Sequence, residues 1–65
     1  MMFNVYEATG VCRRSLRGAF DTFTAACDYV QALNPVCFEE DADHPGCADA
    51  YLPSGLVYVI EQESE

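Results

Sequence analysis

The chain has 65 residues and a mass of 7.2 kDa, so it forms one domain at most, which we place at residues 1–65. Hydrophobic residues make up 51% of it, which favours a folded core over disorder. A domain this small leaves little room for a deep substrate cleft. The net charge of −8 argues against a protein that binds the nucleic-acid backbone directly, and it argues against an anionic membrane surface as a partner.

The charge is distributed unevenly along the chain. Residues 1–20 contain all three arginines and one acid, a net charge of +2, whereas residues 21–65 contain ten acids and no base. Self-repulsion of this kind destabilises a compact state. The acidic part therefore either keeps the protein in solution or attracts a cationic partner through its negative electrostatic potential.

Residues Met2–Ala8 are predicted to form a strand, because Phe3 and Val5 alternate with polar neighbours at a period of two. Thr9 and Gly10 end this strand. Residues Val11–Gly18, which include every arginine, are expected to form a connecting loop.

A helix is predicted next, with Asp21 or Thr22 as the capping residue. Asn34 and Pro35 end it, because proline disfavours helical geometry in the preceding residue. The helix carries one apolar stripe at helical spacing, made of Phe23, Ala26, Cys27, Val30 and Leu33.

The second half of the chain is predicted to form short strands separated by turns. Val36–Glu40 is expected to be a strand with Val36 and Phe38 facing the core, followed by an acidic turn at Asp41–Gly46. Further strands are predicted at Ala48–Leu52 and, after the turn Pro53–Gly55, at Leu56–Gln62, with residues 62–65 as a frayed acidic tail. The predicted fold class is α+β, with one helix packed on a small, mostly antiparallel sheet of three to four strands, in the order β-α-β-β or β-α-β-β-β.

The N-terminus lacks the basic and apolar regions of a secretory signal, and the longest apolar run, Leu56–Ile60, is too short to span a bilayer. We therefore expect a cytoplasmic protein. In that compartment the cysteines are expected to be reduced and to act as small buried hydrophobes. They are Cys12, Cys27, Cys37 and Cys47, although a disulfide or metal-bound state stays open.

No catalytic residue or cofactor is predicted. His44 is the only histidine, and the acids around it disfavour a thiolate nucleophile at the neighbouring Cys47. Two metal sites remain as alternatives. One is zinc on Cys37, His44 and Cys47. The other is calcium on the loop Asp41–Asp49, which lacks the EF-hand glutamate because Leu52 stands at that position.

The carboxylates are the candidate functional groups. Side chains two residues apart on a strand share a face about 6.6 Å apart, so the acids of this chain can form rows. Such rows give a field comparable with that of duplex DNA, which carries one charge per ~1.7 Å of axis. A compact domain of this kind could occupy a groove that normally holds nucleic acid, with electrostatic steering and strong salt dependence.

In size, charge and single-helix-plus-sheet plan, the chain resembles the small acidic anti-CRISPR proteins of the DNA-mimic type that phages and other mobile elements make. The resemblance implies a non-enzymatic inhibitor in the bacterial host cytoplasm. We also expect the protein to be a monomer. The resemblance also implies a partner with a basic nucleic-acid-binding site, and the expected partner is a type I Cascade-like CRISPR surveillance complex whose DNA channel or PAM-reading pocket the protein blocks. The residues expected to bind the partner are Glu39, Glu40, Asp41, Asp43 and Asp49, supported by Asp28 and Glu61.

Two other classes of function remain open. One is a protein-interaction module whose exposed sheet edge, at Leu56–Ile60 or Met2–Tyr6, pairs with a partner strand. The other is a small structural domain stabilised by calcium or zinc, which a chelator would destabilise.

Overall fold

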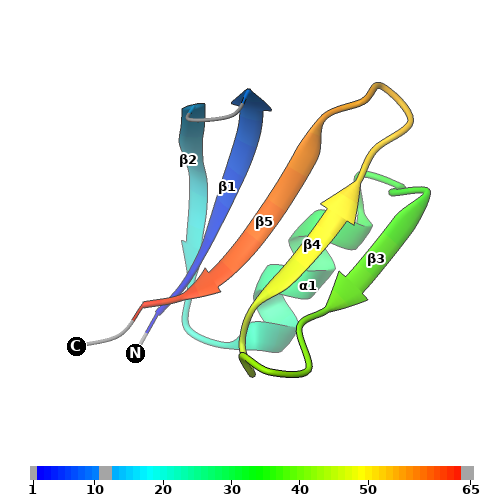
Figure 1. Ribbon diagram of the computed structural model, residues 1–65. Coiled ribbons are helices and arrows are strands. Elements are labelled where there is room, and N and C mark those ends of the chain that lie inside the picture. The colour runs from blue at the N-terminus through cyan, green and yellow to red at the C-terminus, as the bar shows by residue number, and fades with distance from the viewer. Residues whose placement is uncertain (1, 11–12, 64–65) are drawn as a thin grey trace.

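The computed structural model describes residues 2–10 and 13–63 and shows a small α+β fold, one helix on a five-stranded antiparallel sheet (Figure 1). The strands lie in the order β2-β1-β5-β4-β3, and every neighbouring pair is antiparallel. The elements in chain order are β1 (Phe3–Gly10), β2 (Arg13–Phe20), α1 (Phe23–Gln31), β3 (Cys37–Glu40), β4 (Ala48–Tyr51) and β5 (Val57–Gln62).

Strand β2 was not expected. The predicted loop Val11–Gly18 is wrong over its described part, because residues 13–18 belong to a strand that pairs with β1. The sheet therefore has five strands, with two of them before the helix. A break in the β1–β2 register, where Val5 pairs with Gly18 and Tyr6 with Leu16, leaves Arg17 as an extra residue in β2.

The helix begins where the sequence predicts. Thr22 caps it, with its hydroxyl accepting a hydrogen bond from the Ala25 N–H at 3.1 Å. Asn34, at a φ of 58°, and the following Pro35 turn the chain away after the helix. Leu33 lies beyond the last helical turn and is exposed, so it does not extend the apolar stripe.

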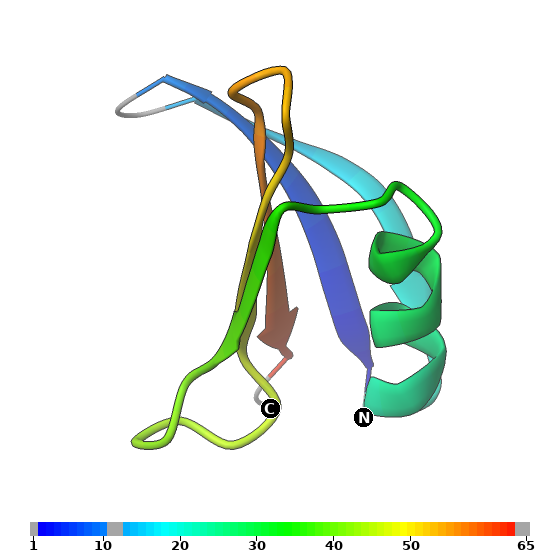
Figure 2. The same cartoon turned by 90° about the vertical axis from the view of Figure 1, so that its right-hand side faces the viewer.

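Helix α1 covers one face of the sheet, where it lies against β1, β2 and β5 (Figure 2). Ala26 and Val30 are fully buried there against Val5 and Ile60. The predicted inward position of Val36 is wrong, since its side chain is 71% exposed just before the edge strand β3. Phe38 does pack against the core, as expected.

The register corrects the expected sheet edges. Strands β1 and β5 pair with each other and each has a second neighbour, so Met2–Tyr6 and Leu56–Ile60 do not provide a free edge. The edges are β2 and β3, the two strands that flank α1 in the sequence. A partner strand added at the predicted positions would have to displace an existing one.

The first and last residues that the structure describes, Met2 and Glu63, lie together. Gln62 is the last residue of β5, and the Glu63 N–H donates a hydrogen bond to the Met2 carbonyl at 2.8 Å. The frayed tail predicted for residues 62–65 is therefore wrong at 62 and 63, and its remainder lies outside the described residues. Over residues 2–10 and 13–63, no helix has the length and apolar character needed to cross a bilayer.

Candidate functional site

The face of the sheet opposite α1 has no layer over it, and we call it the open face. Alternate residues of a strand point to opposite faces, so the register shows which side chains share this face. One row across the strands contains Leu16, Tyr6, Val59, Asp49 and Glu39, in the order β2 to β3. The row beside it contains Arg14, Ala8, Val57, Tyr51 and Cys37, and Asn4 and Glu61 lie on the other side.

Two like charges stand directly opposite each other on this face. Glu39 of β3 pairs with Asp49 of β4 in the ladder, which places their β-carbons about 4.5–5.5 Å apart. Within residues 2–10 and 13–63 neither carboxylate forms an ion pair. A like-charge pair in this position destabilises a sheet. Because no described cation neutralises the two charges, their negative potential is available to another molecule.

The third carboxylate of the open face, Glu61, is already paired. Arg14 crosses from β2 over the ring of Tyr6, with its guanidinium carbon 4.3 Å from the ring centroid. It reaches Glu61 of β5 with an N···O distance of 2.7 Å. Glu61 was predicted to support partner binding, but Arg14 of the same chain already neutralises its carboxylate.

Two more of the predicted acids lie on the other side of the sheet. Glu40 follows Glu39 in β3 and so faces the helix side, and Asp28 is on α1. Both lie near the thiol of Cys27, whose pKa is raised first by its burial and then by these two carboxylates. The sheet thus separates Glu40 and Asp28 from the pair Glu39 and Asp49.

The loop between β3 and β4 holds the last two predicted acids. Asp41 accepts a hydrogen bond from the Asp43 N–H at 2.9 Å and lies 3.1 Å from the imidazole Nδ1 of His44. These contacts, chiefly the one from the Asp43 N–H, lower the pKa of Asp41. The carboxylate of Asp41 is therefore used inside the loop, while the side chain of Asp43 is exposed at its tip.

The structure gives neither metal alternative a site, because no cluster of three or more His, Cys, Asp or Glu side chains able to hold an ion occurs in the part of the chain it describes. The ring of His44 contacts only Asp41 of its own loop among the described ion pairs. Cys27, Cys37 and Cys47 are free thiols, and Cys12 lies outside the described residues. Cys37 is exposed, so the expectation that the cysteines are buried is wrong for it.

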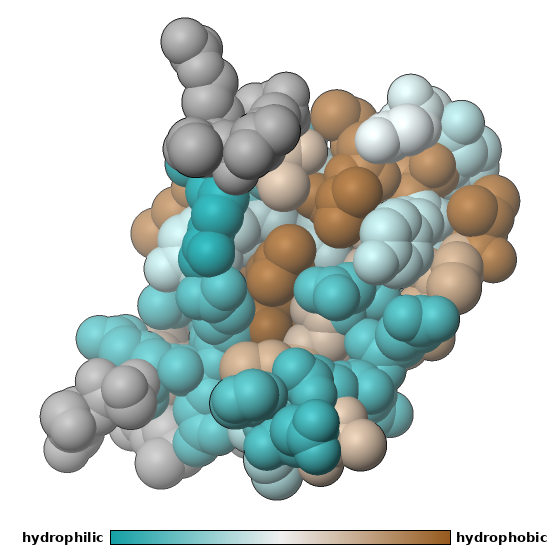
Figure 3. Space-filling model, in the orientation of Figure 1, coloured by the Kyte–Doolittle hydropathy of each residue, from teal (hydrophilic) through white to brown (hydrophobic). Residues whose placement is uncertain are grey.

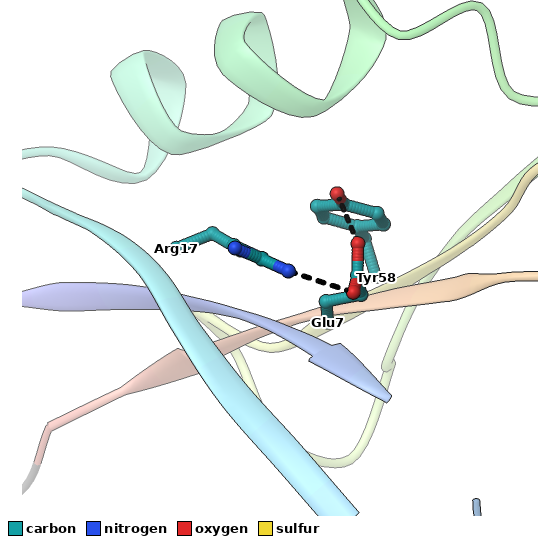
Figure 4. Close-up of polar contacts among 3 residues, drawn as sticks. All are labelled: Glu7, Arg17 and Tyr58. Atoms are coloured by element: carbon teal, nitrogen blue, oxygen red, sulfur yellow. Dashed lines mark hydrogen bonds and ion pairs between the residues drawn. The ribbon is translucent and has the colours of Figure 1, made fainter. Parts of the chain in front are cut away.

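Sequence reasoning missed a polar cluster on the face that α1 covers (Figure 4). The carboxylate of Glu7 accepts a hydrogen bond from the Tyr58 hydroxyl at 2.7 Å and one from Arg17 at 2.9 Å. Both interactions lower the pKa of Glu7, and the first raises the pKa of Tyr58. The signal was present, since Glu7 continues the inward alternation of Phe3 and Val5 and so places a charge where an apolar residue is expected.

The apolar character of the open face was also missed. Val57 and Val59 occupy the outward positions of the central strand β5, beside Tyr6 and Tyr51. Figure 3 shows brown, hydrophobic surface in the middle of this face and teal, hydrophilic surface below it. The signal lies in the run Val57–Ile60, where both alternating faces are apolar, a pattern typical of a strand covered on both sides.

Comparisons with known proteins add no relative, since no protein-family model, curated protein or solved structure matches the chain.

Proposed function

We propose that this protein is a non-enzymatic inhibitor that presents the carboxylates of the β3–β4 hairpin to a basic nucleic-acid-binding site of another protein. The observation that carries the proposal is the opposed pair Glu39 and Asp49, which no described cation neutralises. Asp43 extends the same negative potential to the hairpin tip. The target class that we propose, on the resemblance in size, charge and plan, is a type I Cascade-like CRISPR surveillance complex.

The electrostatics of the hairpin supports this function. A surface of carboxylates that no described arginine neutralises raises the rate of encounter with a basic groove and competes there with the phosphates of DNA. The hairpin carries these groups at one edge of the sheet, with β3 unpaired on its outer side (Figure 1). It can therefore enter a groove without displacing any other element of the protein.

The test measures whether a purified Cascade-like complex binds a fluorescent target duplex in the presence of increasing amounts of the protein. We expect inhibition that weakens between about 50 and 300 mM NaCl, because screening acts on exposed charges. The double variant E39Q/D49N removes the opposed charges and keeps the side-chain size. It should raise the concentration needed for half-inhibition by about tenfold or more.

The matched control is D21N/E63Q, which changes the net charge by the same amount at two exposed positions that are not part of the β3–β4 hairpin. It should inhibit almost as well as the unmodified protein. Equal losses in the two double variants would show that total charge matters rather than the hairpin, and this result would contradict the proposed site. Undisturbed duplex binding at every concentration would exclude this complex as the target.

A further inference from the structure

The open face combines an apolar centre with an acidic border, and this combination bears on the chemistry of the partner. An antiparallel sheet with one face in water usually carries polar residues at its outward positions. Here the outward positions of the central strand are Val57 and Val59, and Tyr51 beside them is 39% exposed. On the β2 side of the open face, Leu16 is 59% exposed.

Charge selects among the molecules that could cover such a face. Glu39 and Asp49 continue the row of Val59 toward the β3 edge, and Arg14 is engaged with Glu61. Nucleic acid and anionic lipid would meet these carboxylates as like charges. A second copy of this chain would bring another net charge of −8 to the interface.

The width of the three central strands matches that of a helix. Neighbouring strands lie about 4.8 Å apart, and a helix with its side chains is about 10–12 Å wide, so one helix covers a strand and its two neighbours. Tyr6 of β1 pairs with Val59, and Tyr51 of β4 pairs with Val57, so a tyrosine flanks β5 on each side. A helix lying along β5, between Tyr51 on one side and Tyr6 with the Arg14 guanidinium over its ring on the other, would mirror α1, which covers the other face (Figure 2).

We propose that the open face is the docking surface for a basic amphipathic α-helix of the partner protein. The apolar stripe of that helix lies on Val57 and Val59, and lysines or arginines on one flank of the stripe reach Asp49 and Glu39. This inference rests on the proposed function and specifies the partner element that meets the acidic hairpin.

The probe is a synthetic 14-residue peptide with leucines at i, i+3, i+4 and i+7 spacing and lysines elsewhere. A peptide of the same composition in scrambled order, which has no apolar stripe, is its control. We expect the striped peptide to bind at least about tenfold more tightly in calorimetry, because only it buries its leucines against the sheet. Amide shifts in ¹⁵N-resolved NMR spectra should concentrate on β5, β4 and β1, at the residues of the open face.

The variant V57T/V59T keeps β-branched side chains and removes apolar surface, so it should weaken binding of the striped peptide about tenfold. Y51T provides a second variant at a more exposed site, and it should weaken binding even if the valine variant fails to fold. E39Q/D49N should weaken the binding of both peptides.

The outcomes separate this inference from the proposed function. Equal affinity for the two peptides, with an effect of E39Q/D49N but none of V57T/V59T or Y51T, would overturn the docking of a helix and leave the acidic site standing. Failure of the striped peptide to bind, amide shifts on the α1 side of the sheet, or a stable dimer through the open face in sedimentation would each overturn the inference. Loss of the E39Q/D49N effect in the Cascade assay would instead overturn the proposed function.

Discussion

Glu7 is the residue whose environment differs most from that of the other acids. Its side chain is 12% exposed, and it is held by the Tyr58 hydroxyl and the Arg17 guanidinium. The other strand carboxylate that pairs with an arginine, Glu61, is 40% exposed, and Glu39 and Glu40 are exposed. Glu7 therefore ties β1, β2 and β5 together through one ionised group.

Replacing Glu7 by Gln should destabilise the protein near neutral pH. The pKa of Glu7 is lowered in the folded state, so its contribution to stability is present above the unfolded pKa and is lost as the pH falls through the folded value. The midpoint of urea unfolding should be lower for E7Q than for the unmodified protein at pH 7, and the difference should shrink below about pH 4. Glu63→Gln, which removes an exposed charge, serves as the control, and an equal effect of the two variants would contradict the assigned role.

At the scale of elements, sequence patterns predicted α1, β1, β3, β4 and β5 because each carries a clear period or turn signal. Thr22 caps the start of the helix, Asn34 and Pro35 follow its end at Gln31, and Gly55 marks the turn before β5. Strand β2 could not be predicted in this way, since its three arginines and Gly18 hide any apolar alternation and its pairing with β1 is irregular. The acids of the hairpin were predicted as a set, but only the register shows that Glu39 stands directly opposite Asp49.

The β3–β4 pair provides a test at this scale. Replacing Glu39 by Lys converts the opposed like charges into an opposite-charge pair, so it should raise the free energy of unfolding by up to about 1 kcal/mol. The same substitution should reduce inhibition of the Cascade-like complex more than E39Q does, because it places a cation against a basic groove. Chemical denaturation and the duplex-binding assay check the two halves. A variant that loses both stability and inhibition would contradict the account of this pair.

At the scale of the whole molecule, repulsion among carboxylates opposes folding. The chain carries eleven acids and three bases, and the described ion pairs with arginine engage only Glu7 and Glu61. Most of the negative charge therefore acts on itself through solvent, and dissolved ions reduce this effect.

Raising NaCl from about 10 to 500 mM should therefore stabilise the protein. We expect a gain of about 1 kcal/mol, which for a chain of this size corresponds to roughly 4–8 °C in Tm. Thermal unfolding followed by circular dichroism measures the change, and E39Q/D49N should show a smaller one. A Tm that falls with added salt would mean that the arginine pairs outweigh the repulsion.

The order of the strands also gives the molecule an electrical direction. The β1–β2 hairpin, which includes all three arginines, and the acidic β3–β4 hairpin lie at opposite sides of the sheet, with β5 between them (Figure 1). Such a particle has a dipole moment lying roughly in the plane of its sheet. In the field of a positively charged cavity it turns before it touches, so that most collisions begin with the acidic hairpin in front and the arginine edge behind.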